Sequence, residues 1–299
     1  MSTVTTPPAE TSAPQPKPRR RRPVIPVLLL VVGIIVMLYP VAATQYNNVR
    51  QQQFANEYGQ QVGQVAKEDL SSEIAAAKEY NSTLSGVPIL DPYLLDVAQD
   101  PGSQQYRRYT SQLSRFDVMA RVRVPSAQID LPVRHGTSDP VIAAGAGHLY
   151  GTSLPVGGEG THSVLTSHRG LSDATLFDHL DQVREGDLMY VDVLGETLAY
   201  KVDQIKVVLP DEIGDLKSVP GHDYLTLFTC TPYAVNSHRL LVRGERVPYT
   251  PEMAQQDGPD GGIHLQMQGW MWWLIAGSAV GIGGVAFIIV RERRRRRAA

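Results

Sequence analysis

Two long apolar stretches, one near each end of the printed sequence, most constrain how this chain can fold. Residues 24–43 are almost uncharged and follow four consecutive arginines, and residues 270–290 are apolar and lead into an arginine-rich tail. A helix needs about 20 apolar residues to cross the hydrocarbon core of a membrane. Arginine clusters favour the cytoplasmic side. The pattern therefore predicts two transmembrane helices in the plasma membrane, with both tails in the cytoplasm and the intervening residues outside the cell.

The first apolar stretch also fits a cleaved signal peptide. Its apolar part is long for such a peptide, and residues 41–44 (VAAT) form only a fair cleavage site. We therefore expect an uncleaved anchor. In the second stretch, Trp270, Trp272 and Trp273 stand at the expected outer end, as is typical of the aromatic belt of a membrane helix.

Charge is spread unevenly along the 299 residues, although the formal net charge is only −2. Residues 1–22 carry +4 and residues 291–299 carry +5, so residues 23–290 carry −11. An acidic body argues against nucleic acid as a partner, whereas basic tails suit an anionic membrane face. The charge pattern therefore indicates a membrane-tethered protein that does not bind nucleic acid.

Short runs of alternating apolar and polar residues recur between residues 117 and 248. This alternation is typical of β-strands, and a series of about eight short strands with Gly and Pro turns favours a closed barrel. The expected elements are strands at 118–124, 127–133, 162–168, 187–194, 197–208 and on both sides of 231–238, a turn at 125–126, a tight crossover at 145–155 and a short helix at 173–180. The predicted fold class is all-β, a closed eight-stranded barrel with short helices.

Changes in composition divide the chain into successive parts. The first residues are rich in Pro, Ser and Thr, which predicts disorder, and residues 45–83 have near-helical apolar spacing. The expected parts are a basic cytoplasmic tail (1–22), a transmembrane helix (23–44), a helical stalk (45–83), a proline-broken lead-in (84–116), the barrel (117–248), a linker (249–269), a second transmembrane helix (270–290) and a basic cytoplasmic tail (291–299).

The single cysteine, Cys230, follows an alternating apolar run, and Arg239 opens the next apolar run nine residues later. Two strands joined by this loop would place a thiol and a guanidinium at neighbouring strand ends. A nearby cation lowers the pKa of a thiol and can stabilise an oxyanion. The alternatives are a buried core cysteine and an ordinary rim arginine, and Arg243 would share the strand face of Arg239.

Residues 225–243 (LTLFTCTPYAVNSHRLLVR) resemble the active-site signature of sortases, the cysteine transpeptidases of Gram-positive cell surfaces, and are most similar to the pilin-polymerising class C branch. Residues 145–155 and 167–171 (SHRGL) extend the resemblance. The resemblance implies a sortase-type barrel with Cys230 as nucleophile, His168 as general acid and base, and Arg239 at the oxyanion. No cofactor is implied.

The chain has eight histidines, and neither a paired metal-ligand spacing such as HExxH nor a GxSxG nucleophile turn is present. The sequence therefore predicts no metal site and no serine hydrolase. His238 is the main alternative to His168. Because neighbouring residues on a strand point to opposite faces, His238 and Arg239 should not face one site together.

Asp91, Pro92 and Tyr93 match the lid of class C sortases in type and position, so residues 84–116 are expected to hold a lid. In that family the acidic residue lies by the catalytic arginine and the aromatic residue covers the cysteine. A carboxylate pairs well with arginine, which suits this arrangement. The expected substrate is an LPXTG-like sorting signal cleaved between Thr and Gly, and the expected acceptor is the amine of a pilin lysine.

Three other functions fit the same features. The first is a housekeeping sortase that anchors proteins to cell-wall peptide. The second is a thiol peptidase in which water resolves the thioester. The third is a membrane-tethered assembly scaffold without enzymatic activity.

Overall fold

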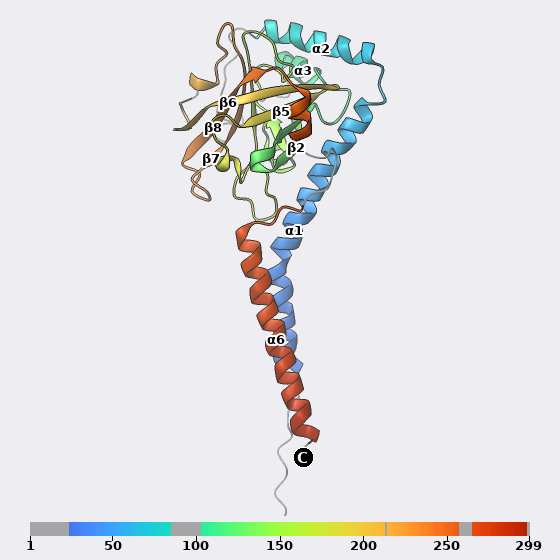
Figure 1. Ribbon diagram of the computed structural model, residues 1–299, viewed down its shortest axis with the longest axis vertical. Coiled ribbons are helices and arrows are strands. Elements are labelled where there is room, and N and C mark those ends of the chain that lie inside the picture. Colours follow the sequence, from blue (N-terminus) through green and yellow to red (C-terminus); the bar gives the residue numbers. More distant parts are fainter. Residues whose placement is uncertain (1–23, 85–102, 213, 257–264, 298–299) are drawn as a thin grey trace, which may run out of the picture. The chain divides into compact units, whose positions relative to one another are not determined.

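A computed structural model describes residues 24–84, 103–212, 214–256 and 265–297, and these form two compact units (Figure 1). One unit combines α1 (Val24–Val62) up to Leu38 with α6 (Gly269–Arg297) from Leu274. The other runs from Tyr39 to Trp273.

In the first unit the two helices pack against each other. A Cβ added at Gly281 would lie 3.5 Å from Ile34, and the Ser278 hydroxyl lies 3.7 Å from the Met37 sulfur. Large apolar side chains point outward, with Ile25 71% exposed. Both α1 and α6 are long and apolar enough to cross a membrane.

The second unit is built on a closed eight-stranded barrel, as the alternating runs predicted. The strands follow the order β1-β2-β3-β4-β7-β8-β6-β5 around the barrel. They are β1 (Ala120–Val124), β2 (Ile129–His135), β3 (Ala146–His148), β4 (Thr161–Thr166), β5 (Leu188–Val193), β6 (Glu196–Val208), β7 (Asp223–Thr231) and β8 (His238–Val247). The predicted all-β fold class is confirmed.

The pairing of the strands decides which loops meet. β7 lies between β4, with which it is parallel, and β8, with which it is antiparallel. Parallel strands end at the same edge of a sheet, and the strand antiparallel to them begins there. The residues after β4, the end of β7 and the start of β8 therefore lie together.

Short helices connect the strands. They are α4 (Asp139–Ala143), the 3₁₀ turns η2 (Pro125–Ala127), η3 (Leu180–Gln182) and η4 (Gly214–Leu216), and α5 (Pro251–Gln256) after the barrel. The expected crossover at 145–155 contains the strand β3, which the Gly-rich sequence concealed.

The helix expected at 173–180 is wrong, because turns precede η3 there. Leu176 has a φ of +47° and is only 4% exposed. A left-handed residue interrupts the hydrogen-bond ladder of a right-handed helix. The apolar side chains in this stretch are buried in the barrel core without a helix.

Helices on the N-terminal side dock onto the barrel. α2 (Lys67–Ser82) lies across one end of it and buries Leu70, Ile74, Ala77 and Tyr80 on one face (Figure 1). Those positions recur at the helical period, which explains why this polar segment folds as a helix. α3 (Gln104–Thr110) follows, and its first turn is capped by Ser103, which accepts a hydrogen bond from Tyr106 N at 3.1 Å.

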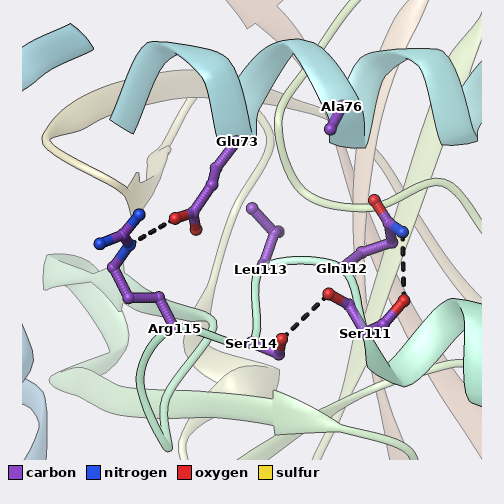
Figure 2. Close-up of a pocket in the computed structure, with 7 residues that line it drawn as sticks. All are labelled: Glu73, Ala76, Ser111, Gln112, Leu113, Ser114 and Arg115. Atoms are coloured by element: carbon purple, nitrogen blue, oxygen red, sulfur yellow. Dashed lines mark hydrogen bonds and ion pairs between the residues drawn. The ribbon is translucent and has the colours of Figure 1, made fainter. Parts of the chain in front are cut away.

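A cavity of about 370 Å³ lies between α2 and the loop after α3. Figure 2 shows Glu73 and Ala76 of α2 facing residues 111–115, with an ion pair between Glu73 and Arg115. None of the lining residues belongs to the site predicted from the sequence.

Candidate active site

Cys230 and Arg239 face each other across the β7–β8 pair. They are direct register partners, Cys230 one residue before the end of β7 and Arg239 one residue after the start of β8. Both are buried, Cys230 at 6% and Arg239 at 4% exposure. The strand–loop–strand arrangement inferred from the sequence thus brings the thiol residue and the guanidinium residue onto adjacent strands.

The end of β4 runs alongside the end of β7. The parallel register pairs Thr166 with Phe228, and the Thr166 hydroxyl donates to the Phe228 carbonyl at 2.9 Å. One residue further, the Thr229 hydroxyl donates to the Ser167 carbonyl at 2.8 Å. The pairing therefore continues beyond the formal end of the strand.

The next contacts fix the position of His168. Arg169 Nη1 donates to the Thr231 hydroxyl at 3.2 Å, on the far side of His168 from the previous contact. His168 is thus bracketed by contacts to both neighbours of Cys230. The fold places His168, Cys230 and Arg239 next to one another at one edge of the barrel.

His168 sits in a partly buried position, with its side chain 22% exposed. Burial lowers its pKa from 6.5, and the nearby Asp139 carboxylate acts in the opposite direction. Asp139 Oδ1 lies 3.9 Å from His168 Nε2, at the start of α4. Neutral imidazole therefore predominates at neutral pH, and protonation yields an imidazolium near an acidic group. Nothing in the sequence around Asp139 signalled this proximity.

Arg239 is held by its own loop. Its Nη1 donates to the carbonyls of Asn236 at 3.0 Å and His238 at 3.2 Å. Ala234 and Asn236 in this loop have φ values of +62° and +60°. The tight turn orients carbonyls toward the guanidinium and so fixes it beside the cysteine.

His238 and Arg243, the alternatives to His168 and Arg239 in the sequence, do not have the positions expected of site residues. His238 Nδ1 lies 2.9 Å from the Ser237 hydroxyl, and alternation along β8 directs His238 to the face opposite Arg239. Arg243 forms an ion pair with Asp203 at 2.6 Å and stacks over Tyr224 at 4.2 Å. These contacts give Arg243 a structural role on the outer surface.

Two further histidines are buried inside the barrel unit. Burial lowers the pKa of His148 and of His162 to about 4 in each case. His148 Nε2 lies 2.8 Å from the Ser153 carbonyl, and His162 Nε2 lies 2.7 Å from the Thr226 hydroxyl. Both are therefore neutral, hydrogen-bonded core residues.

Among the residues that the structure describes, no three His, Cys, Asp or Glu side chains group closely enough to hold a metal ion. The lid residues predicted from the sequence, Asp91, Pro92 and Tyr93, lie outside the described residues. The arrangement at the barrel edge offers a nucleophile, a titratable acid and base, and a fixed cation. Those are the groups needed for acyl transfer through a thioester.

Comparisons of this chain with a family model, with solved structures and with other protein sequences all find sortases. The family model described as Sortase domain matches residues 122–247. A crystal structure of sortase C-1 from Actinomyces oris is 53% identical, covers 60% of this chain and 99% of that chain, and superposes with a TM-score of 0.58. Sortase C from Streptococcus pneumoniae, whose structure is described as informing catalysis and pilin substrate specificity, is 42% identical with a TM-score of 0.58 and covers 64% and 95%. Sortase A from Streptococcus agalactiae is 25% identical over 73% of this chain and 83% of that protein.

Proposed function

The chain belongs to the sortase family, and we propose that it is a membrane-anchored transpeptidase of the pilin-polymerising class C type. Transpeptidation is the activity of the family, and solved class C enzymes are among the structural neighbours. The observation that carries the proposal is the convergence of Cys230, His168 and Arg239 at the adjoining ends of β4, β7 and β8.

The proposed first half-reaction forms a thioester. The Cys230 thiolate attacks the carbonyl carbon between Thr and Gly of an LPXTG-like signal, and the resulting oxyanion lies beside Arg239. The His168 imidazolium gives its proton to the Gly nitrogen as the C–N bond breaks. The peptide after Thr leaves with a free amine, and His168 becomes neutral.

The second half-reaction reverses these roles. The amine of a pilin lysine attacks the thioester carbon, and neutral His168 accepts a proton from that amine. The C–S bond breaks, Cys230 leaves as the thiolate, and an isopeptide bond joins the two pilin subunits. His168 suits both steps because histidine is the side chain that gains and loses a proton most readily near neutral pH. Burial lowers its pKa, and the Asp139 carboxylate acts in the opposite direction.

We propose that the ends of the chain anchor the enzyme. α1 and α6 are long and apolar enough to span a membrane. An arginine cluster precedes the apolar part of α1, and another follows the apolar part of α6. The positive-inside rule then places both tails in the cytoplasm and the barrel outside. We also propose that Asp91, Pro92 and Tyr93 form a lid over the site, with Asp91 by Arg239 and Tyr93 over Cys230.

Mass spectrometry of the full chain in detergent micelles, incubated with an LPXTG peptide, tests the proposal. A mass gain on Cys230 equal to the acyl fragment, absent from Cys230→Ala and released by an added amine, is the expected result. An adduct that forms only after Asp91→Ala and Tyr93→Ala would indicate a site closed by its lid. His168→Ala should abolish turnover, whereas His238→Ala should retain it.

If neither the intact chain nor the lid variant forms an adduct, the scaffold function replaces the enzymatic one. If water alone releases the acyl group from Cys230, and added amine does not increase the rate of release, the protein is a thiol peptidase instead.

A housekeeping sortase is the second candidate, favoured by the similarity to sortase A from Streptococcus agalactiae. The acceptor distinguishes the two. A class C enzyme should transfer the acyl group to a lysine-containing pilin peptide in preference to a cell-wall peptide amine, and a housekeeping enzyme should show the reverse preference.

A further inference from the structure

The backbone around His168 is fixed by a segment that follows it in the chain. Phe177 N donates to the His168 carbonyl at 3.2 Å. Gly170 N donates to Asp178 Oδ1 at 2.6 Å. The turn that carries His168 is therefore closed at both ends by residues 177 and 178.

Asp178 connects this turn to the beginning of α6. It is only 7% exposed, and its second oxygen accepts a hydrogen bond from Gln268 Nε2 at 2.7 Å. Gln268 is itself 6% exposed and stands immediately before α6. Its Oε1 accepts a hydrogen bond from the Trp270 indole, which leaves the amide group facing the carboxylate.

α1 supports the same segment from another direction. The Asn48 side chain and Thr175 exchange two hydrogen bonds, Asn48 Nδ2 to the Thr175 hydroxyl at 2.8 Å and Thr175 N to Asn48 Oδ1 at 3.0 Å. The Thr44 hydroxyl donates to the Ser172 carbonyl at 3.1 Å. Thr44, Asn48 and Thr175 are all at most 4% exposed.

Buried polar groups are costly to leave without partners. Residues 171–178 bury apolar side chains in the barrel core, and polar side chains from α1 and from Gln268, just before α6, hold the same segment in addition. The Asp178 carboxylate is the link that reaches the histidine turn, because one oxygen accepts from Gly170 and the other accepts from Gln268.

We propose that Asp178 and Gln268 are positioning residues for His168. Gln268, the residue immediately before α6, fixes the turn that carries the proposed acid and base, and it does so through the Asp178 carboxylate. This inference rests on the proposed function for the role of His168, and it extends that function by making the C-terminal helix a support of the reaction centre as well as an anchor.

The test uses the full chain in detergent micelles with an LPXTG peptide and an amine. Gln268→Glu places a second carboxylate against Asp178 and should break the link. Because small displacements of a catalytic group strongly reduce the rate, we expect kcat to fall about tenfold, with KM unchanged. Gln266→Glu is the matched control. Its side chain donates to the Gln128 carbonyl and has no hydrogen bond to residues 171–178 in the described structure, so kcat should be unchanged.

Exchanging the two chemical groups provides the rescue. In the double variant Asp178→Asn with Gln268→Glu, the Asn amide donates to the Glu carboxylate and the Asn oxygen still accepts from Gly170. The Thr175 hydroxyl can donate to the same carboxylate. We expect kcat to return to within about threefold of the original enzyme. A general loss of folding would not be repaired in this way.

A second readout is independent of activity. Hydrogen–deuterium exchange of residues 168–178 should accelerate in Gln268→Glu and in the milder Gln268→Ala, and should be unchanged in Gln266→Glu and in the double variant.

Equal kcat and equal exchange in Gln268→Glu and Gln266→Glu would overturn the inference, as would a double variant no better than Gln268→Glu. If neither the original enzyme nor its Asp91→Ala, Tyr93→Ala lid variant turns over the peptide, the proposed function fails, and the exchange pattern alone then decides whether Gln268 holds the turn.

Discussion

Ala234 adopts a left-handed backbone conformation in the exposed loop that joins Cys230 to Arg239, with φ at +62°. A side chain in this region costs about 1–2 kcal/mol relative to glycine. Replacement by glycine costs about 0.4–1 kcal/mol through the greater freedom of the unfolded chain. We expect Ala234→Gly to raise the free energy of unfolding by about 0.5–1 kcal/mol in chemical denaturation.

Ala144→Gly is the matched control, since Ala144 is also exposed but has a φ of −96°. Without strain to relieve, that substitution should lower the free energy of unfolding. Equal effects of the two substitutions would show that Ala234 is not strained.

Among individual residues of the candidate site, the sequence predicted those that belong to a recognisable motif. Cys230 is the single cysteine and Arg239 follows it at hairpin distance, so their pairing across β7 and β8 could be inferred. The positions of Asp139 and Asp178 near His168 could not be inferred from the sequence. Each of them comes close to His168 only because the loops between the strands fold back on the barrel. Neither carboxylate belongs to a motif that marks its partner in the sequence.

Among the helices on the N-terminal side, α1 is attached to the barrel through Tyr58. Its hydroxyl donates to the Met119 carbonyl at 3.1 Å and accepts from Leu194 N at 2.8 Å, and the side chain is 3% exposed. Tyr58→Phe would leave both buried backbone groups without this partner. We expect the free energy of unfolding to fall by about 1–3 kcal/mol in chemical denaturation.

Tyr46→Phe in the same helix is the control, because Tyr46 is 63% exposed. It should change the free energy of unfolding by no more than about 0.5 kcal/mol. If both variants have the same stability as the original protein, the two hydrogen bonds do not dock α1.

Strands were more predictable than the irregular segments between them. Alternation marks a half-buried strand directly, and β1, β5, β6 and β7 lie where it predicted. Residues 173–180 were expected to form a short helix, but burial in the barrel core and the left-handed Leu176 give turns instead. Periodicity could not distinguish these outcomes, since both bury the same side chains.

For the molecule as a whole, buried histidines make stability depend on pH. The pKa values of His148 and His162 are lowered to about 4, from an ordinary value of 6.5. Their unfolded forms therefore bind protons first as the pH falls. The stabilising contribution is complete above pH 6.5 and is lost progressively between about pH 6.5 and pH 4. Burial also lowers the pKa of His135 and of His168, which act in the same direction.

We expect the free energy of unfolding to fall by up to about 3 kcal/mol for each of the two histidines between pH 7 and pH 4. Chemical denaturation followed by circular dichroism at several pH values measures the slope. His162→Gln should make the fall between pH 7 and pH 4 smaller by up to about 3 kcal/mol, the contribution of His162. A free energy that is constant across this range would show that these histidines are protonated in the folded state.

The order of strands around the barrel also determines when the proposed site is completed during synthesis. β7 is inserted between β4, made well before it, and β8, made after it. A nascent chain that has released Cys230 but not β8 lacks both the strand that carries Arg239 and the closure of the barrel. The proposed site of Cys230 is thus completed only when β8, the last strand of the barrel to be made, pairs with β7.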